Sequence, residues 1–418
     1  MLDIKYIRKN PKKIKQAAEQ KNIQINIDRL LSIDRTCINL RKEIEDLRSE
    51  QNKYKKKPSK TELVKLKKIA IKVNQQQKKL RELQKEMTEL MLLVPNIPDS
   101  KAPVGADQRS NQLVKTWGNP IRFSFKPKSH IDLGLKLDIV DFVRGVKIGG
   151  FRSYFLKNEG ALLDLAITRY AIDFMIARGF TIMAPPIINL QKYFYGTGFL
   201  PWFKEEIFEL SKQKDQALIG TSEVPLVSYY AEEVLSIDDL PVKLAGYSPC
   251  FRTEIGSYGK ETKGLYRVRQ FNKVEQVVLC KNDYSESMRW LEEIQKNAED
   301  FIQSLGLPYR VMEMCTGEMG VSKVKMFDLE TWMPSFNHYR ETHSASNLGD
   351  FQSRRLNIRY KDKDRKIQYV HTLNNTVIAT PRILIPLLEN HQQGDGSVRI
   401  PEVLHKYTGF KSIEPKRK

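Results

Sequence analysis

The chain has 418 residues, of which 40% are hydrophobic, so it is long enough to bury a large core and to form two or three domains. Its net charge of +20 at pH 7 favours nucleic acid as a partner, although a membrane surface or solubility alone gives the same sign. The sequence has no apolar run of about 18 residues, which argues against a spanning helix. The charged N-terminus also lacks the apolar segment of a secretory signal. The four cysteines form no CxxC pair, which argues against a zinc site or disulfides and favours the reducing cytoplasm.

The first 100 residues carry 25 Lys and Arg against 13 Asp and Glu, so most of the net charge lies in under a quarter of the chain. This region shows apolar or tolerated residues at alternating spacings of three and four, which is typical of a coiled-coil seam. The seam positions are Leu30, Ile33, Cys37, Leu40, Ile44, Leu47, Gln51, Tyr54, Leu66, Ile69, Val73, Gln76, Leu80, Leu83, Met87, Leu90 and Val94. Pro58 and Ser59 interrupt the repeat once, which predicts two antiparallel helices over about residues 28–94.

The residues away from this seam are charged or carry amides, so the helical hairpin should project from the rest of the protein as an arm. A dimerisation coil or a solvated spacer would show the same pattern. Clustered lysines near the turn, at 53 and 55–57, favour contact with phosphates instead. The following residues, 94–111, are rich in proline and polar side chains and indicate a linker.

Beyond the linker, aromatic residues, glycines and short β-type runs occur together with helices. Helices are predicted over 160–178 and 285–305, and strands over 180–184, 242–247, 266–279, 324–331 and 366–372. Strands joined as hairpins and mixed with helices predict an antiparallel α+β domain rather than a doubly wound one. The sequence contains no GxxxxGK[ST], and no GxGxxG opens a helix after a strand, so neither a P-loop nor a Rossmann site is supported.

Residues 250–279 read CFRTEIGSYGKETKGLYRVRQFNKVEQVVL, in which a loop rich in Gly and Lys separates two arms. If both arms are strands, Arg252 and Glu254 share a face. The same period of two places Arg267, Arg269, Phe271, Lys273 and Glu275 on one face. Arg can bind phosphate, Phe can stack on a base and Glu can accept from an exocyclic amine, so the set suits a nucleotide. An exposed, salt-bridged hairpin explains the pattern equally well.

Three further segments carry polar groups that suit small ligands. GTSEVPL places the Thr221 hydroxyl beside the Glu223 carboxylate, which could hold an ammonium group or simply cap a helix. ETHSASNLGDFQSRR contains Glu341 and Ser344, oxygen ligands of the kind that Mg²⁺ prefers. HTLNNTVIATPRILIPLLENHQ predicts a strand, a turn and a helix, with Arg382 near the helix N-terminus as part of an anion site.

Together and in this order, these segments resemble the seryl-tRNA synthetases, which are class II aminoacyl-tRNA synthetases. The resemblance covers nearly the whole chain and is carried by GTGFLPWF, GTSEVPL, FRTEIGS…GLYRVRQFNKVE, ETHSASNLGDFQSRR and HTLNNTVIATPRILIPLLENHQ. It implies an α+β chain in which an antiparallel helical coiled-coil hairpin precedes a class II catalytic domain with a mainly antiparallel β-sheet flanked by helices. The predicted boundaries are 1–100 for the tRNA-binding arm domain, 101–112 for the linker and 113–418 for the catalytic domain.

The resemblance implies a serine–tRNA ligase that uses ATP and Mg²⁺. L-Serine would form seryl-adenylate with release of pyrophosphate and would then pass to the 3′ end of tRNA(Ser), and also of tRNA(Sec) where present. The implied catalytic residues are Arg252, Arg382 and Glu341, and the implied metal ligands are Glu341 and Ser344. The implied serine-binding residues are Thr221, Ser222, Glu223, Arg252, Glu275, Asn374 and Thr376. The implied ATP-binding residues are Arg252, Thr253, Glu254, Val268, Phe271, Glu341, Thr342, His343, Ser344 and Arg382.

The resemblance also implies a cytoplasmic homodimer, with the interface near residues 178–190, and a helical arm that contacts tRNA. The implied tRNA-binding residues are Lys53, Lys55, Lys56, Lys57, Lys260 and Lys263. The chain departs from the family pattern at the short, basic tip of the arm and at Thr342 and His343, where His343 could instead lack a chemical role. Two alternatives are a ligase that charges a carrier protein, which the basic arm disfavours, and an inactive RNA-binding relative, which the retained polar residues disfavour.

Overall fold

The computed structural model describes residues 1–54, 58–255 and 263–416. The chain divides into two compact units, Met1–Ile97 and Pro98–Lys418, so the linker predicted at 101–112 falls within the second unit. Lys55, Lys56, Lys57 and Lys260, four of the predicted tRNA contacts, lie outside the described residues. Within the described ranges, no helix combines the length and the apolar character that crossing a membrane requires.

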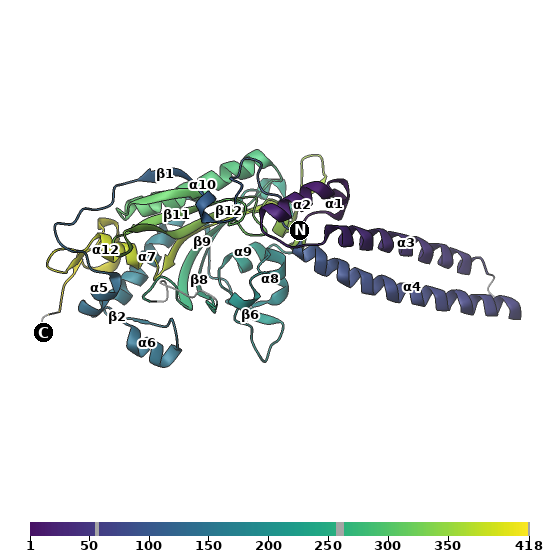
Figure 1. Cartoon of the computed structure of the whole chain (residues 1–418), viewed down its shortest axis with the longest axis horizontal. Helices are drawn as coiled ribbons and strands as arrows, with labels where there is room; N and C mark the ends of the chain where they lie inside the picture. Colours follow the sequence, from purple (N-terminus) through teal and green to yellow (C-terminus); the bar gives the residue numbers. More distant parts are fainter. Residues whose placement is uncertain (55–57, 256–262, 417–418) are drawn as a thin grey trace. The chain divides into compact units, whose positions relative to one another are not determined.

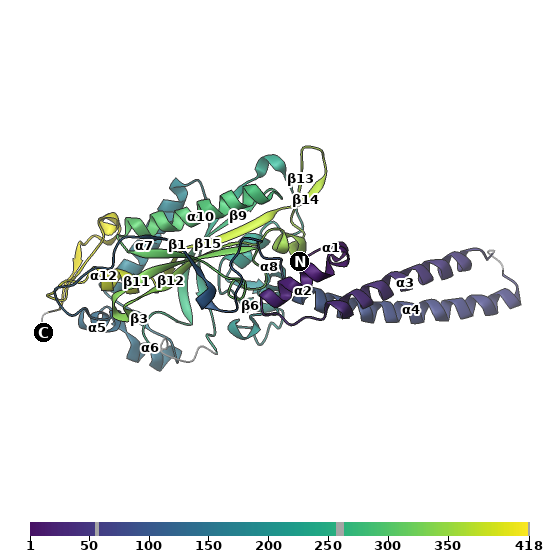
Figure 2. The ribbon, with the colours of Figure 1, turned by 45° about the horizontal axis from the view of Figure 1, so that its top comes forward.

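The first unit is helical, and two long helices dominate it. Its helices are α1 (Ile4–Lys9), α2 (Pro11–Gln20), α3 (Ile27–Asn52) and α4 (Lys60–Leu93). Figures 1 and 2 show α3 and α4 side by side, and the Arg29–Glu86 ion pair at 2.8 Å joins the start of α3 to the end of α4, as in an antiparallel hairpin. The predicted break is where α4 begins: the Ser59 hydroxyl accepts from the Glu62 amide, and the Glu62 carboxylate accepts from the Ser59 amide.

The predicted seam is the contact between these two helices. Its buried members are Leu30, Ile33, Cys37, Leu40 and Ile44 on α3, Ile69 and Val73 on α4, and Val94 directly after α4. Gln51 near the turn is exposed, whereas Tyr54 packs against the cluster of Ile44, Ile69 and Val73. The narrow apolar stripe is buried within the hairpin, and the charged side chains around it face outward, as the period of the sequence requires.

The second unit is built on one eight-stranded sheet. In spatial order its strands are β1 (Gln112–Trp117), β10 (Tyr309–Glu313), β11 (Lys325–Met333), β12 (His338–Asn347), β15 (His371–Thr380), β9 (Gln270–Cys280), β8 (Val242–Phe251) and β4 (Thr181–Met183). Every neighbouring pair is antiparallel except β4 and β8, which are parallel. The predicted α+β class, with a helical hairpin before a mainly antiparallel sheet, is therefore confirmed.

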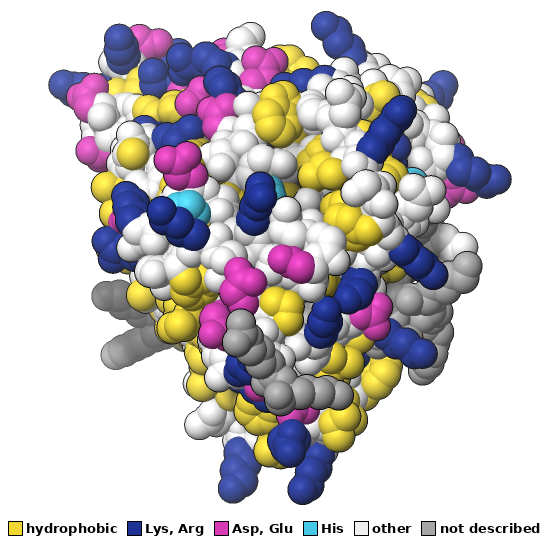
Figure 3. Space-filling view, turned by 90° about the vertical axis from the view of Figure 1, so that its left-hand side faces the viewer, with side chains coloured by type: hydrophobic (Ala, Val, Ile, Leu, Met, Phe, Trp, Pro, Cys, Tyr) yellow, Lys and Arg dark blue, Asp and Glu magenta, His cyan; other side chains and the backbone are white. Residues whose placement is uncertain are grey.

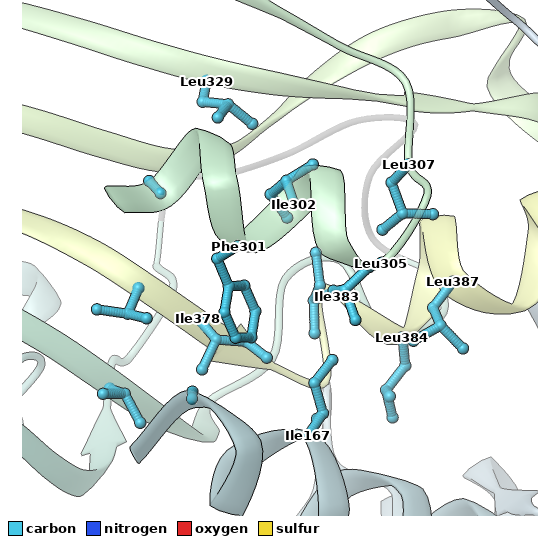
Figure 4. Close-up of a cluster of buried hydrophobic side chains, with 14 of the residues drawn as sticks. Ile167, Phe301, Ile302, Leu305, Leu307, Leu329, Ile378, Ile383, Leu384 and Leu387 are labelled. Carbon is cyan, nitrogen blue, oxygen red and sulfur yellow. The ribbon is translucent and has the colours of Figure 1, made fainter. Parts of the chain in front are cut away.

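Two long helices, α7 (Glu159–Ala177) and α10 (Tyr284–Ser304), cover one face of this sheet (Figure 2). Val274 and Val278 of β9 point into their core, whereas Val277 and Leu279 belong to a separate cluster on the other face. Figure 4 shows the first cluster, in which Ile167 of α7, Phe301 of α10 and Ile378 of β15 pack with the start of α12 (Leu384–Asn390). Alternation along the strands thus leaves the opposite face of the sheet free to carry polar side chains.

Shorter elements surround the sheet. The remaining helices are α5 (His130–Lys136), α6 (Phe142–Gly149), α8 (Gln191–Thr197), α9 (Glu223–Ser228), α11 (Phe351–Leu356) and α13 (His405–Thr408). The remaining strands are β2 (Val140–Asp141), β3 (Phe155–Leu156), β5 (Ile188–Leu190), β6 (Gln216–Leu218), β7 (Val234–Ser236), β13 (Arg359–Lys361), β14 (Ile367–Tyr369), β16 (Val398–Arg399) and β17 (Ser412–Ile413). Of these, α8, α9 and α11 lie against the polar face of the sheet or against one another, beside the cavity described next.

Candidate active site

A cavity of about 330 Å³ opens on the polar face of the sheet, within the size range of small-molecule sites. Its walls come from stretches that are far apart in the sequence. They are residues 194–207, 220–224, 251–254, 265–275, 318–326, 341–348 and 374–382, each represented by several lining side chains. Most of these stretches contain one of the motifs that the sequence analysis singled out.

The structure brings most of the predicted site residues together in this cavity. Those that line it are Thr221, Glu223, Arg252, Glu254, Val268, Phe271, Glu275, Glu341, Thr342, Ser344, Asn374, Thr376 and Arg382. Three predicted residues do not line it. The Ser222 hydroxyl donates to the Gly246 carbonyl, the Thr253 hydroxyl donates to the Glu205 carbonyl, and His343 lies buried on the core side of β12. Of the predicted tRNA contacts, Lys53 and Lys263 are exposed.

The hairpin of residues 250–279 differs from its prediction at the loop ends. β8 ends at Phe251 and β9 begins at Gln270, so Arg252, Glu254 and Arg267 lie beyond the strands and do not owe their positions to strand alternation. Instead the chain turns at Glu254, which has a φ of 55°. The Glu254 carboxylate accepts from Arg152 Nη1 at 3.1 Å and pairs with Arg267 Nη1 at 3.5 Å. Arg152, a buried residue after α6, gave no signal in the sequence because it lies about 100 residues from its partner.

A buried cation that had been assigned no role holds the centre of the cavity. Lys273 Nζ lies 2.6 Å from Glu275 Oε2 and donates to Thr221 Oγ1 at 2.6 Å. The Thr376 hydroxyl donates to the same carboxylate at 3.3 Å. Lys273 is 6% exposed and Glu275 is 3% exposed, so water screens this pair very little. The alternation that places Phe271 and Glu275 on one face of β9 also places Lys273 there, so the position of Lys273 in the site could have been predicted from the sequence.

A second carboxylate, Glu223 at the start of α9, lies in the same region. Burial raises the pKa of Glu223, and the negative charge of Glu275 raises it further. Gln352 Nε2 donates to Glu223 Oε1 at 2.7 Å, and the Gln352 carbonyl oxygen accepts from Thr372 Oγ1 at 2.7 Å. The buried amide of Gln352 therefore fixes the orientation of the Glu223 carboxylate from below the cavity floor.

An irregularity in β12 explains how Glu341 and Ser344 both line the cavity although they are three residues apart. In the pairing with β11, His343 lies opposite Leu329 and Glu341 lies opposite Glu330, so Thr342 is an extra residue. Such a β-bulge shifts the alternation by one residue. As a result Glu341 and Ser344 face the cavity together, whereas His343 faces the core.

Two arginines line the cavity, Arg252 after β8 and Arg382 after β15. Arg252 Nε donates to the Gly220 carbonyl at 3.3 Å, and its guanidinium lies 5.3 Å from the centre of the Phe271 ring. The Arg382 guanidinium lies 4.5 Å from the centre of the Tyr266 ring, and its Nη1 is 3.7 Å from Glu341 Oε1. With Phe271 as an aromatic surface, the arrangement offers guanidinium groups for phosphates and a ring for a base.

The core of this unit matches the family model of the tRNA synthetase class II core domain (G, H, P, S and T) over residues 204–391. The antiparallel sheet, the motifs that meet on one of its faces and this match define a class II aminoacyl-tRNA synthetase.

Within that class, residues 1–98 match the seryl-tRNA synthetase N-terminal domain. A serine–tRNA ligase from Deinococcus radiodurans is 42% identical over 99% of both chains. The crystal structure of seryl-tRNA synthetase from Pyrococcus horikoshii, complexed with ATP, is 40% identical, with a TM-score of 0.92 over 100% of both chains. A cytoplasmic serine–tRNA ligase from Naegleria fowleri in complex with AMP is 32% identical over 98% of this chain and 96% of that one, with a TM-score of 0.88. The chain belongs to the seryl-tRNA synthetase family.

The Lys273–Glu275 pair predicts a large loss of stability when only one partner is removed. Lys273→Met leaves a buried carboxylate without its cation, which should lower the free energy of unfolding by about 3–5 kcal/mol. Lys281→Met removes a half-exposed lysine whose Nζ lies 4.0 Å from Glu286, and should cost less than about 1 kcal/mol. Urea unfolding of both variants measures the difference. The double variant Lys273→Met/Glu275→Gln should recover most of the lost stability. Equal losses for Lys273→Met and Lys281→Met would contradict the buried-pair interpretation.

Proposed function

We propose that the chain activates L-serine with ATP, forming seryl-adenylate and pyrophosphate, and then transfers serine to the 3′ end of tRNA(Ser). The observation that carries the proposal is the convergence of Arg252, Glu275, Glu341 and Arg382 on one cavity. The family match and the ATP-complexed relative support it. The proposal extends to tRNA(Sec) where that tRNA is present. The buried, free cysteines fit a reducing compartment, so we place the reaction in the cytoplasm.

In the proposed serine site, Thr221 and Glu223 hold the ammonium group and Arg252 holds the carboxylate. Glu275, Asn374 and Thr376 form hydrogen bonds with the side-chain hydroxyl of the serine substrate. These groups lie in a buried pocket, and a pocket that satisfies a hydroxyl leaves its own polar groups unpaired when alanine binds. Selection against alanine should therefore be strong.

In the proposed ATP site, Phe271 stacks on one side of the adenine and Arg382 covers the other side and reaches the γ-phosphate. Glu254 accepts from the adenine amine and the Val268 backbone lines the base pocket. Arg252 bridges the serine carboxylate and the α-phosphate, so it brings the attacking oxygen and the phosphorus together. An in-line displacement of this kind needs positioning and charge neutralisation rather than a covalent nucleophile.

We propose Mg²⁺ as the metal, held by Glu341 and Ser344 together with phosphate oxygens. No group of three or more His, Cys, Asp and Glu among residues 1–54, 58–255 and 263–416 is placed to hold a metal by itself, which suits an ion whose other ligands come from the nucleotide. Asp328 of β11, opposite Ser344, adds a buried carboxylate whose Oδ1 has no hydrogen-bond partner. Burial raises the pKa of Asp328 well above its usual range, and the charge of Glu341 adds to this effect. The donors are all hard oxygens, so they fit Mg²⁺, which would neutralise charge on the phosphates.

The direct test is serine-dependent exchange of pyrophosphate into ATP, measured with serine, threonine, alanine and glycine. We expect exchange with serine only, and a fall to background when Mg²⁺ is chelated. Arg252→Ala should reduce the rate by roughly 100- to 1,000-fold, because it removes a preorganised cation at the reacting phosphate. Arg399→Ala, which removes an exposed arginine on β16, is the matched control and should leave the rate unchanged.

An absence of exchange with all four amino acids would leave only an RNA-binding role. Exchange with serine but no charging of tRNA would instead favour a ligase that charges a carrier protein.

We propose that the helical arm binds tRNA through its lysines. The support is the charge of the first unit, the exposure of Lys53 and the match to the seryl-tRNA synthetase N-terminal domain. Recognition by lysines is recognition of backbone and shape, and it releases counterions from the RNA. The exposed Lys263 and the undescribed Lys260 are proposed to guide the acceptor end.

Replacing Lys53, Lys55, Lys56 and Lys57 with Gln should weaken tRNA binding. It should also reduce the steepness of the fall of log K with log[salt] by about three, while pyrophosphate exchange persists. A filter-binding titration at several salt concentrations measures this slope. The control neutralises four exposed lysines of the second unit, Lys361, Lys363, Lys366 and Lys411. Equal slopes for the two variants would mean that the arm lysines are only a solvated surface.

We propose that the catalytic units pair as a homodimer through the segment predicted at 178–190 and the apolar face of α6 and of α7, the helix that ends directly before this segment. The exposed apolar side chains of this face are Val143, Val146, Ile148, Phe151, Leu162 and Leu165, with Val143 78% and Ile148 75% exposed. Apolar side chains are visible among the charged ones toward the bottom of Figure 3, the end of the unit at which Figure 1 places α6. A patch of this kind on a basic, highly charged chain is typical of an interface.

Sedimentation should give a particle of two 48.6 kDa chains. Val143→Glu/Ile148→Glu should shift it to one chain, because two charges would be buried without partners. Ile367→Glu, an equally apolar and 52% exposed position on β14, is the control and should leave the dimer intact. A monomeric parent chain would contradict the proposal.

A further inference from the structure

β12 and β15 are neighbours in the sheet, but they pair over a short length only. Their described register runs from Asn347 opposite Leu373 to Ala345 opposite Asn375 and stops there. Each strand remains paired on its other side, β12 with β11 and β15 with β9. The sheet therefore divides, toward the cavity, into two ribbons that are no longer joined by a backbone ladder.

The two ribbons carry different halves of the proposed site. The β11–β12 ribbon carries Glu341 and Ser344, the proposed metal and phosphate contacts. The β9–β15 ribbon carries Glu275 and Thr376, the proposed serine contacts, which are hydrogen-bonded to each other. The spacing between the ribbons therefore sets the distance between the nucleotide contacts and the amino acid contacts.

His343 spans the gap between the ribbons on the core side. If the ladder continued for two more residues, His343 would lie opposite Val377. In place of that ladder bond, His343 Nε2 lies 3.0 Å from the Val377 carbonyl oxygen. A carbonyl oxygen can only accept, so Nε2 carries the hydrogen, and the other ring nitrogen, Nδ1, shares the Thr342 hydroxyl at 2.9 Å. The side chain is 1% exposed, so these bonds do not compete with water.

Both partners of the imidazole are the extra residues of β-bulges. Thr342 is the extra residue of β12, as described above. Val377 is the extra residue of β15, because Thr376 lies opposite Glu275 and Ile378 lies opposite Val274. A bulge leaves backbone groups unpaired, and a buried unpaired carbonyl is costly. His343 satisfies one of these groups and ties the two irregularities to each other.

Residues just beyond the ends of β9 and β15 also reach Glu341 of β12 at the rim of the cavity. The Tyr266 hydroxyl and Arg382 Nη1 both donate to the Glu341 carbonyl, at 3.1 Å and 3.4 Å. Arg382 is itself a proposed ATP contact, so its bond to Glu341 should change when nucleotide binds. Val377 and His343 are buried in the core and do not line the cavity, so we expect their bond to persist through the reaction.

We propose that His343 is a positioning residue, which holds the β11–β12 ribbon at a fixed distance from the β9–β15 ribbon and thereby places Glu341 and Ser344 for ATP. This inference rests on the proposed function, because it concerns the spacing of the proposed nucleotide and serine contacts. The proposed serine contacts on β9 and β15 are held in place by the backbone hydrogen bonds between these two strands. Loss of the His343 bond should therefore weaken ATP binding much more than serine binding.

The test compares His343→Ala with His391→Ala. His391 makes the same type of bond, from Nε2 to the Leu305 carbonyl at 2.9 Å, but this bond does not link the two ribbons. His343→Ala should raise the KM for ATP in pyrophosphate exchange by roughly 10- to 100-fold, because small misplacements of contacts are costly, and leave the KM for serine unchanged. His391→Ala should lower the unfolding midpoint without changing either KM. Calorimetric binding of Mg–ATP should show the same split without relying on exchange.

A second pair of variants keeps the test decisive if His343→Ala does not fold. His343→Gln can place an amide N–H near the position of Nε2, whereas His343→Asn reaches only the position of Nδ1. We expect Gln to restore ATP binding and Asn not to restore it. Equal effects on the two KM values, or equal behaviour of Gln and Asn, would overturn the inference. A parent chain that binds Mg–ATP but shows no exchange would overturn the proposed function alone, and one that does not bind Mg–ATP would overturn both.

Discussion

The close approach of α9 to β8 is the contact on which the cavity depends. A Cβ at Gly246 would lie 2.7 Å from Leu226 Cδ1 and 2.9 Å from Ser222 Cβ, so only glycine lets the helix approach this strand. The Ser222 hydroxyl then donates to the Gly246 carbonyl at 3.2 Å, which fixes the start of the helix. Because Gly246 lies opposite Glu275 in the sheet, this contact brings Thr221 and Glu223 up to the charged face of β9. Ser222, which was predicted to bind serine, therefore contributes by anchoring its neighbours.

The charges that meet at this contact are unbalanced in a way that suits an amino acid. Glu223 and Glu275 are two buried carboxylates, and Lys273 is the ammonium group that pairs with one of them. The remaining carboxylate, Glu223, has a raised pKa because it is buried beside a like charge. An incoming ammonium group would add positive charge beside Glu223 and favour its ionised form. The groups proposed to bind the substrate would thus be least stable without it, as is common where binding residues are desolvated in advance.

Much of this arrangement could be predicted from local patterns in the sequence. The spacings of three and four gave the seam of α3 and α4, and the break at Pro58 and Ser59 gave the position of the turn. Alternation along β9 gave the shared face of Phe271 and Glu275, and it also contained Lys273, whose role was missed because a lysine in a strand is usually exposed. These features depend on residues a few positions apart, whose geometry a helix or strand period determines.

The features that could not be predicted depend on tertiary contacts that no period encodes. Strand alternation would place Glu341 and Ser344 on opposite faces, and only the bulge at Thr342 brings them together. A bulge has no fixed sequence signature, because it is set by the pairing with the neighbouring strand and by groups that satisfy its unpaired backbone. His343 is such a group, and its bond to Val377 joins segments 34 residues apart. The cavity requires β12 and β15 to separate, and separated strands need a buried link of this kind to keep one spacing, which is why a histidine on the core face matters for ligands on the other face.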